Sequence, residues 1–164
     1  MVVLLTGPSA AGKTTIGRLL AERFERGVHL EGDLFCRAIV SGHAELTPDA
    51  DGEALAQLEL RYRIAAAAAD AYAAAGFTVV HDDVVAGPLL ETHARPHTFV
   101  LLPSREELER RASARGTRYG SFSPGELHRL FAAETPRVGT WLDTTEQTPA
   151  DTVTGILAQL PSGA

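Results

Sequence analysis

The stretch that decides the fold is residues 7–14, which read Gly7-Pro8-Ser9-Ala10-Ala11-Gly12-Lys13-Thr14. It matches the phosphate-binding motif G-x-x-x-x-G-K-[ST] at every position. An apolar run at 2–6 precedes it, and apolar residues at helical spacing follow it, namely Ile16, Leu19, Leu20 and Phe24. A strand, a glycine loop and a helix are the context in which this motif binds phosphate. The alternative is a glycine-rich turn without a ligand.

The two glycines of this loop suit an anion site. Gly7 and Gly12 can adopt backbone angles closed to other residues, so successive N–H groups can point inward. The following helix adds unpaired N–H groups and the positive end of its dipole. Lys13 is expected to reach the β- and γ-phosphates in a catalytic role, and the Thr14 hydroxyl to ligate Mg²⁺. The expected nucleotide-binding residues are Gly7, Pro8, Ser9, Ala10, Ala11, Gly12, Lys13, Thr14 and Thr15.

Length and composition predict one domain spanning residues 1–164, with an ordinary apolar core, because 45% of the residues are hydrophobic. No apolar run approaches the ~20 residues of a membrane span, so no membrane contact is expected. Met1 leads straight into a strand, which argues against a signal peptide. Cys36 is the only cysteine, so an intramolecular disulfide is impossible. These features together favour a cytoplasmic protein.

The charge distribution argues against a nucleic-acid partner. The formal net charge is −6, so a broad basic surface is not expected. The arginines are nevertheless concentrated in one region, with seven between Arg105 and Arg137. Beside a phosphate-binding loop, this concentration favours a clamp for a polyphosphate.

Five segments read as strands and alternate with helical sequence, at 2–6, 28–30, 77–81, 98–102 and 141–143. This alternation predicts an α/β fold with three α/β/α layers around a parallel sheet. The longest helix is expected to begin at Thr47-Pro48 and end at Gly76. Its apolar face, at steps of three and four, comprises Leu55, Leu58, Tyr62, Ala65, Ala69 and Tyr72.

Three later helices begin at recognisable caps. Ser104 with Glu107 and Ser123 with Glu126 form capping-box patterns, and Thr148-Pro149 opens the last helix. Residues 116–123 lie between the first two of these helices and contain two glycines, an arginine and two aromatic residues. We interpret this segment as a small mobile lid. A plain helix–helix connection is the alternative.

Two acidic positions follow strands. Asp33 lies in Glu31-Gly32-Asp33 after the second strand, where Gly32 permits a close approach to a bound hydroxyl. Asp33 is therefore a candidate catalytic base and substrate contact, and Glu31 could hold a water on the metal. The alternative is that Asp33 caps the helix that follows.

The strongest internal strand ends in His81-Asp82-Asp83, which is typical of a Walker B carboxylate near Mg²⁺. Consecutive strand residues point to opposite sides, so only one aspartate can face the phosphate loop. Asp82 is preferred as the metal and substrate residue, whereas Asp83 would cap a helix or touch substrate. His81 is interpreted as structural.

Arg111 and Arg115 share one helix face just before the lid, because they are four residues apart. Arg111 is predicted to contact the nucleotide, and Arg115 and Arg118 to neutralise charge on the transferred phosphoryl group. The alternative is a solvated face paired to Glu106, Glu107 and Glu109. That alternative suits Arg105 and Arg110, whereas Arg111 and Arg115 are expected to lie off most of these pairings.

The order of these parts resembles the small P-loop kinases, including the adenylate, shikimate and gluconate kinase-like enzymes. Within that group the phosphate loop and the Gly32-Asp33 element look most like the chloramphenicol phosphotransferase-like kinases. The resemblance implies a five-stranded parallel sheet and the use of ATP with Mg²⁺. It also implies that Asp33 accepts the proton of the substrate hydroxyl and that Arg111, Arg115 and Arg118 are lid-side arginines.

These features lead to one main hypothesis, transfer of the ATP γ-phosphoryl group to a hydroxyl of a small molecule such as an antibiotic. The predicted acceptor pocket comprises Asp33, Phe35, Arg37, Tyr62 and Asp82. One alternative is a metabolic kinase for a nucleotide, nucleoside or sugar acid, in which Arg37 and Arg61 would bind an acceptor anion. Another is an NTP-binding regulatory ATPase. The sequence indicates neither the acceptor nor the oligomeric state.

Overall fold

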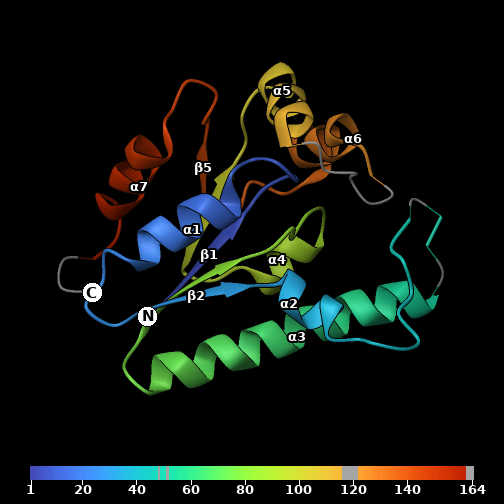
Figure 1. Ribbon diagram of the computed structural model, residues 1–164, viewed down its shortest axis with the longest axis horizontal. Helices are drawn as coiled ribbons and strands as arrows, with labels where there is room; N and C mark the ends of the chain where they lie inside the picture. The colour runs from blue at the N-terminus through green and yellow to red at the C-terminus, as the bar shows by residue number, and fades with distance from the viewer. Residues whose placement is uncertain (48, 51, 116–121, 162–164) are drawn as a thin grey trace.

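The computed structural model describes residues 1–47, 49–50, 52–115 and 122–161 of the chain. Its centre is a five-stranded parallel sheet in the order β2-β3-β1-β4-β5 (Figure 1). The strands are β1 (Val2–Thr6), β2 (Gly27–Glu31), β3 (Thr78–Asp82), β4 (His97–Leu101) and β5 (Thr140–Leu142). The predicted α/β class with five parallel strands is confirmed, and each observed strand begins and ends within one residue of its prediction.

Helices cover both faces of the sheet and make three layers (Figure 1). On one face, Val3 and Leu5 of β1 share a core with apolar residues of α1 (Lys13–Ala21), α5 (Arg105–Arg115) and α7 (Pro149–Leu157). On the other face, Leu4 packs with Tyr62, Leu90 and Phe131. Those three residues belong to α3 (Gly52–Ala74), α4 (Leu89–His93) and the π-helix η1 (Leu130–Glu134).

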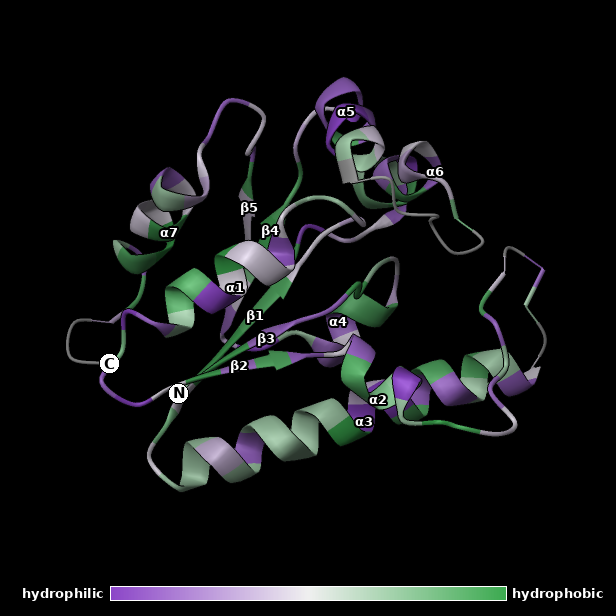
Figure 2. Cartoon of the chain, viewed as in Figure 1, coloured by the Kyte–Doolittle hydropathy of each residue, from purple (hydrophilic) through white to green (hydrophobic). Residues whose placement is uncertain are grey.

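The alternation of side chains along β1 explains this arrangement, because successive residues of a strand face opposite sides. A strand buried on both faces must be apolar at every position, as residues 2–5 are. Figure 2 shows β1 in green, flanked by helices of mixed hydropathy, whereas β2 and β3 also carry hydrophilic residues. With β1 at its centre, the sheet places the phosphate-binding loop between the segments that follow β3 and β4.

The long helix differs from its prediction at its first turn. It begins at Gly52 rather than at Pro48, and Pro48 lies outside the described residues. Its buried residues include Tyr62, Ala65 and Ala69, as predicted, but Leu55 and Tyr72 are 53% and 45% exposed. The two alanines lie in the middle of the helix and are fully buried, whereas Leu55 and Tyr72 lie near its two ends. Gly76 follows the helix with a φ of 85°, as expected at a helix end.

The capping predictions are largely confirmed. Ser123 and Thr148 form complete capping boxes with Glu126 and Asp151, at the starts of α6 (Pro124–Arg129) and α7. Ser104 accepts a hydrogen bond only from the Glu107 backbone, because the Glu107 carboxylate is bound by arginines of the same helix. The short helices α2 (Asp33–Arg37) and α4 and the π-helix complete the chain. Of the predicted lid at 116–123, residues 116–121 lie outside the described part.

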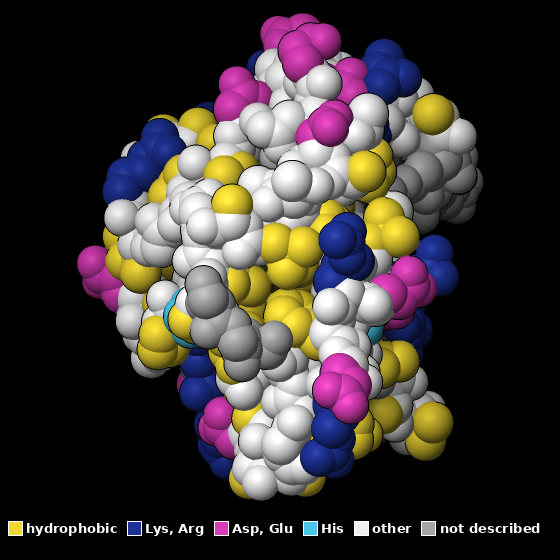
Figure 3. All heavy atoms as spheres, turned by 90° about the vertical axis from the view of Figure 1, so that its left-hand side faces the viewer, with side chains coloured by type: hydrophobic (Ala, Val, Ile, Leu, Met, Phe, Trp, Pro, Cys, Tyr) yellow, Lys and Arg dark blue, Asp and Glu magenta, His cyan; other side chains and the backbone are white. Residues whose placement is uncertain are grey.

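Among the helices that the structure describes, none has the length and apolar character needed to cross a bilayer. The face that carries α7 and the two chain ends is shown in Figure 3. Acidic and basic side chains are interspersed on that face, and no single basic surface covers it.

Candidate active site

The phosphate-binding loop has the backbone geometry of an anion nest. Gly7, Ala10 and Gly12 all have positive φ angles, of 146°, 67° and 98°. A Cβ at Gly7 would overlap the carbonyl oxygen of Leu101, so only glycine fits there. The positive φ of Ala10 is unusual for a residue with a Cβ, and such conformations concentrate at ligand-binding loops. These features fit a bound polyphosphate.

Lys13 is held inside this loop. Its side chain is buried, and Nζ donates hydrogen bonds to the carbonyl oxygens of Gly7 at 2.9 Å and Pro8 at 3.0 Å. The ammonium group therefore lies against the loop that would surround a phosphate. Thr14 and Thr15, in the first turn of α1, are exposed.

Arg111 connects α5 to the phosphate loop. Its guanidinium donates to the carbonyl oxygens of Ala11 at 3.4 Å and Thr144 at 2.8 Å, and it pairs with Glu107 at 2.6 Å. The expectation that Arg111 lies off the glutamate pairings was therefore wrong, because Glu107, four residues earlier on the helix, bridges both Arg110 and Arg111. The predicted pairings of Arg105 and Arg110 are present. Arg111 nevertheless lies where the loop meets the segment after β5.

Three charged groups meet at the carboxyl edge of β2 and β3. Arg61, from α3, donates to Asp83 Oδ1 at 2.7 Å and lies 3.7 Å from Asp33 Oδ1. The Asp83 side chain is 1% exposed, whereas that of Asp33 is 69% exposed. Asp33 occupies the first turn of α2, and Gly32 is the N-cap residue, so Asp33 is not the cap that the alternative reading assigned to it. Its exposed carboxylate remains available to a ligand.

Asp82 points to a different place from Asp83. Its Oδ2 lies 2.6 Å from His29 Nε2, and a Cβ added at Gly17 of α1 would lie 3.4 Å from the same oxygen. Asp83 instead pairs with Arg61 at 2.7 Å, and the same guanidinium lies 3.7 Å from Asp33. The structure thus pairs Asp82 with β2 and α1, and it brings Asp83, which was not preferred from the sequence, to Arg61 and Asp33. The strand β3 ends at Asp82, where the chain turns. The side chain of Asp83 therefore points in a different direction from that of Asp82.

A cavity of 330 Å³ opens beside these groups, between α2, the segment at 38–46 and α3. Its lining includes Phe35, Cys36, Ile39, Leu58, Arg61 and Ile64. Asp33 does not line the cavity but lies at the same guanidinium, that of Arg61. This cavity is the candidate acceptor pocket, and it was missed from the sequence because the 37–56 segment carries no motif.

Of the predicted pocket residues, Phe35 lines this cavity and Asp33 lies beside it at Arg61, whereas Asp82, Tyr62 and Arg37 lie elsewhere. Tyr62 is a core residue, 3% exposed, and its hydroxyl donates to the Val84 carbonyl oxygen at 2.6 Å. Burial raises the pKa of Tyr62. Arg37 is exposed and lies 3.7 Å from Glu31, outside the cavity lining. The positions of Tyr62 and Arg37 follow from the helical period, because only one face of α2 and one of α3 can border the cavity.

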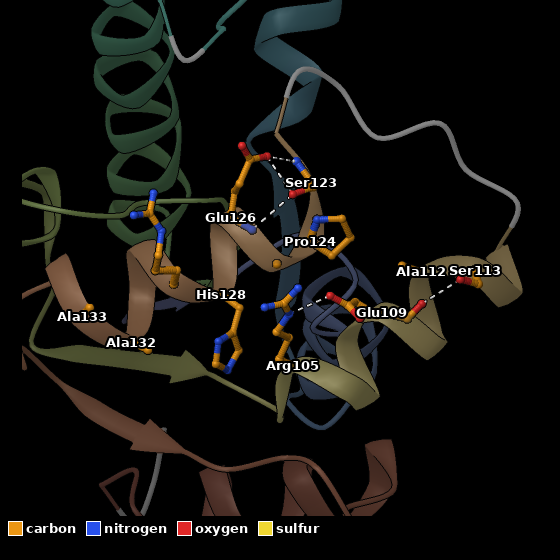
Figure 4. Close-up of a pocket in the computed structure, with 12 residues that line it drawn as sticks. Arg105, Glu109, Ala112, Ser113, Ser123, Pro124, Glu126, His128, Ala132 and Ala133 are labelled. Atoms are coloured by element: carbon orange, nitrogen blue, oxygen red, sulfur yellow. Dashed lines mark hydrogen bonds and ion pairs between the residues drawn. The ribbon is translucent and has the colours of Figure 1, made fainter.

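Of the three predicted lid-side arginines, Arg111 lies at the phosphate loop as described above. Arg118 lies outside the described residues, and of Arg115 the structure gives only its position at the end of α5. Another hollow, of 980 Å³, lies between α5, α6 and η1 (Figure 4). Its lining, which includes the Arg105–Glu109 ion pair and the Ser123 cap, contains none of the predicted site residues.

Close packing between Gly32 and Asp83 gives a first testable prediction. A Cβ at Gly32 would overlap the Asp83 carboxylate, which is enclosed. We expect Gly32→Ala to lower the free energy of unfolding in urea by about 1–3 kcal/mol, the usual cost of overpacking. The control is Gly155→Ala, because nothing lies within 4 Å of that Cβ and the helix favours alanine. Equal stability of Gly32→Ala and the wild type would contradict this packing.

Two buried groups should give opposing pH dependences. Burial raises the pKa of Asp83 to about 6 from its ordinary 3.8, although the nearby Arg61 guanidinium opposes this rise. The contribution of Asp83 to the free energy of unfolding therefore falls as pH rises from about 4 to about 6. Burial lowers the pKa of His81 to about 4 from 6.5, so its contribution is lost as pH falls through that window.

We therefore expect the two slopes largely to cancel in the wild type. Asp83→Asn should become more stable as pH rises from about 4 to 6, and His81→Gln less stable, by roughly 1 kcal/mol per pH unit. Urea unfolding at each pH measures both slopes. Parallel curves for the two variants would show that these groups do not titrate differently in the folded state.

The phosphate loop and the order of the parallel strands are those of the P-loop kinase fold. The family model of chloramphenicol phosphotransferase-like proteins matches residues 1–161, and the chain belongs to that family. No protein of curated function matches the sequence significantly.

Several solved structures share the fold. Shikimate kinase from Acinetobacter baumannii, in complex with shikimate, superposes with a TM-score of 0.66 at 20% identity, covering 96% of this chain and 91% of that one. The tunicamycin resistance protein of Deinococcus radiodurans gives 0.65 at 18% identity, covering 96% and 94%. A gluconokinase from Sinorhizobium meliloti 1021 gives 0.61 at 22% identity, covering 96% and 89%.

Proposed function

We propose that this protein transfers the γ-phosphoryl group of ATP to a hydroxyl of a small molecule. The observation that carries the proposal is the grouping at one edge of the sheet. Arg61 lies 2.7 Å from the Asp83 carboxylate and 3.7 Å from the exposed carboxylate of Asp33. The Asp83 backbone N–H donates at 3.1 Å to a carbonyl oxygen of β1, the strand that leads into the phosphate loop. A phosphate site, a candidate base and a cavity lined by Arg61 are thus neighbours.

The nucleotide would occupy the loop formed by residues 7–15. The N–H groups of the nest and the Lys13 ammonium would bind the phosphates, and Arg111 would border the nucleotide where α5 meets the loop. Mg²⁺ would supply charge neutralisation on the β- and γ-phosphates, with the exposed Thr14 hydroxyl as a ligand. An aspartate carboxylate in the outer shell of the Mg²⁺ ion would complete its site. The sequence favours Asp82 for this position, whereas the Asp83 carboxylate is buried and paired with Arg61.

Asp33 would act on the acceptor. Its carboxylate accepts the proton of the attacking hydroxyl, and the oxygen then bonds to the γ-phosphorus as ADP leaves. Lys13 stabilises the charge that develops on the phosphoryl oxygens. Arg115 and Arg118 would add positive charge from the lid side.

The experiment is ATP consumption with ADP detection across hydroxyl compounds that include aminoglycosides, phenicol and nucleoside antibiotics, nucleosides and sugar acids. We expect one class to stimulate ADP formation strongly and to become a phosphomonoester. Stimulation by an antibiotic would identify a resistance kinase. Tight ATP binding without stimulation by any acceptor would overturn the proposal in favour of a regulatory ATPase.

A further inference from the structure

We propose that Asp83 sets the acceptor specificity of this kinase by occupying Arg61, so that the pocket rejects acceptors bearing a carboxylate or a phosphate. The inference deepens the proposed function and rests on it, because it concerns the acceptor pocket of the same site.

An arginine in an acceptor pocket would ordinarily bind an acceptor anion. Arg61 is the arginine that lines the 330 Å³ cavity, and its side chain is 15% exposed. Arg37, the other arginine nearby, is exposed, pairs loosely with Glu31 and does not line the cavity. Among the arginines whose side chains the structure describes, recognition of an acidic acceptor in this cavity would therefore depend on Arg61.

The guanidinium of Arg61 already has an internal carboxylate partner. Asp83 Oδ1 accepts from Arg61 at 2.7 Å and from the Val84 backbone N–H at 2.7 Å, which fixes the carboxylate in place. The packing against Gly32 encloses it further. Breaking a buried ion pair leaves an uncompensated charge, so an acceptor anion could not displace Asp83 cheaply.

The remaining charges near the cavity are also unfavourable for an anion. Asp33 lies 3.7 Å from the same guanidinium, so two carboxylates surround one positive charge. Glu45, in the cavity lining itself, adds a third acidic side chain to the surroundings of the pocket. His43 lines the cavity in contact with Cys36, with Nε2 and Sγ 3.0 Å apart, and the other lining residues named above are apolar. The pocket thus favours neutral or cationic hydroxyl compounds.

Cys36 provides a direct probe of this charge, because it lines the cavity and is the only cysteine in the chain. Its reaction with two methanethiosulfonate reagents of similar size, one cationic and one anionic, compares local potential without requiring catalysis. The reaction is run near pH 8, with the Asp83 carboxylate paired to Arg61 at 2.7 Å. We expect the cationic-to-anionic rate ratio at Cys36 to exceed that of a free thiol by about tenfold.

The decisive variant is Asp83→Asn, which keeps the shape and removes the charge. We expect it to lower the rate ratio at Cys36 several-fold and to lower the KM of acidic acceptors relative to neutral ones. The matched control is Asp70→Asn, which removes the carboxylate that Asp70 of α3 presents to Arg95, a residue between α4 and β4. That variant should leave the ratio unchanged.

Three results would overturn the inference: a wild-type ratio no higher than that of a free thiol, equal ratios for the two variants, or a wild-type preference for the acidic member of an acceptor pair. The wild-type labelling needs no variant, so the inference stays testable even if Asp83→Asn fails to fold. Failure of every acceptor to react while the labelling ratio holds would count against the proposed function instead.

Discussion

Replacing Lys13 with alanine is expected to lower the rate of phosphoryl transfer by about a hundredfold to a thousandfold, the usual effect of removing one group that stabilises transition-state charge. Lys13 Nζ lies against the Gly7 and Pro8 carbonyl oxygens, inside the loop that would hold the phosphates. The water-poor setting of this buried ammonium strengthens its electrostatic effect. The measurement is acceptor-dependent ADP formation at saturating ATP.

A control on the same helix separates this effect from general loss of positive charge. Arg18→Ala removes an exposed cation that pairs only with Glu22 among the described residues, and it should leave the rate unchanged.

Lys13 is also the only lysine in the sequence. Reductive methylation with labelled formaldehyde therefore yields a single lysine NMR signal, which should shift when nucleotide binds. A rate for Lys13→Ala within a few-fold of the wild type would exclude Lys13 from the phosphate site.

Asp33→Asn is expected to reduce kcat by about 10²- to 10⁴-fold, the contribution of a general base, while sparing the affinity for ATP. The asparagine keeps the size of the side chain but cannot accept the proton of the hydroxyl. The Asp33 side chain is 69% exposed, so the substitution should leave the fold intact. The measurement is single-turnover transfer beside nucleotide titration.

Asp70→Asn serves as the control for Asp33→Asn as well, because Asp70 is an exposed aspartate paired with Arg95 and lies on α3, outside the site. It should retain full activity. If Asp33→Asn turned over as fast as Asp70→Asn, another group would have to take the hydroxyl proton, and the assignment of Asp33 would fail.

Local patterns predicted the framework of this protein well. Residues 2–6 form β1 with the predicted bounds, because an apolar run buried on both faces has few other conformations. The phosphate loop was also predictable, since its glycines are needed at positive φ. The capping boxes at Ser123 and Thr148 were also predictable, because each one involves residues only three positions apart.

The partners of the charged residues could not be predicted, because they are set by contacts between distant segments. Arg61 reaches Asp83 across 22 positions of the chain, and Asp82 reaches His29 across 53. Choosing between Asp82 and Asp83 required the point at which β3 ends and the chain turns. The pocket depends on how α2 and α3 pack, and no local pattern in the 37–56 segment encodes that packing.

The most direct test of the central claim is ³¹P NMR of the products formed from ATP, Mg²⁺ and an acceptor that stimulates ADP release. We predict the resonance of a new phosphomonoester, formed in proportion to ADP by the wild type and nearly absent with Asp33→Asn. Release of inorganic phosphate alone, at a rate unaffected by the acceptor or by Asp33→Asn, would contradict the account.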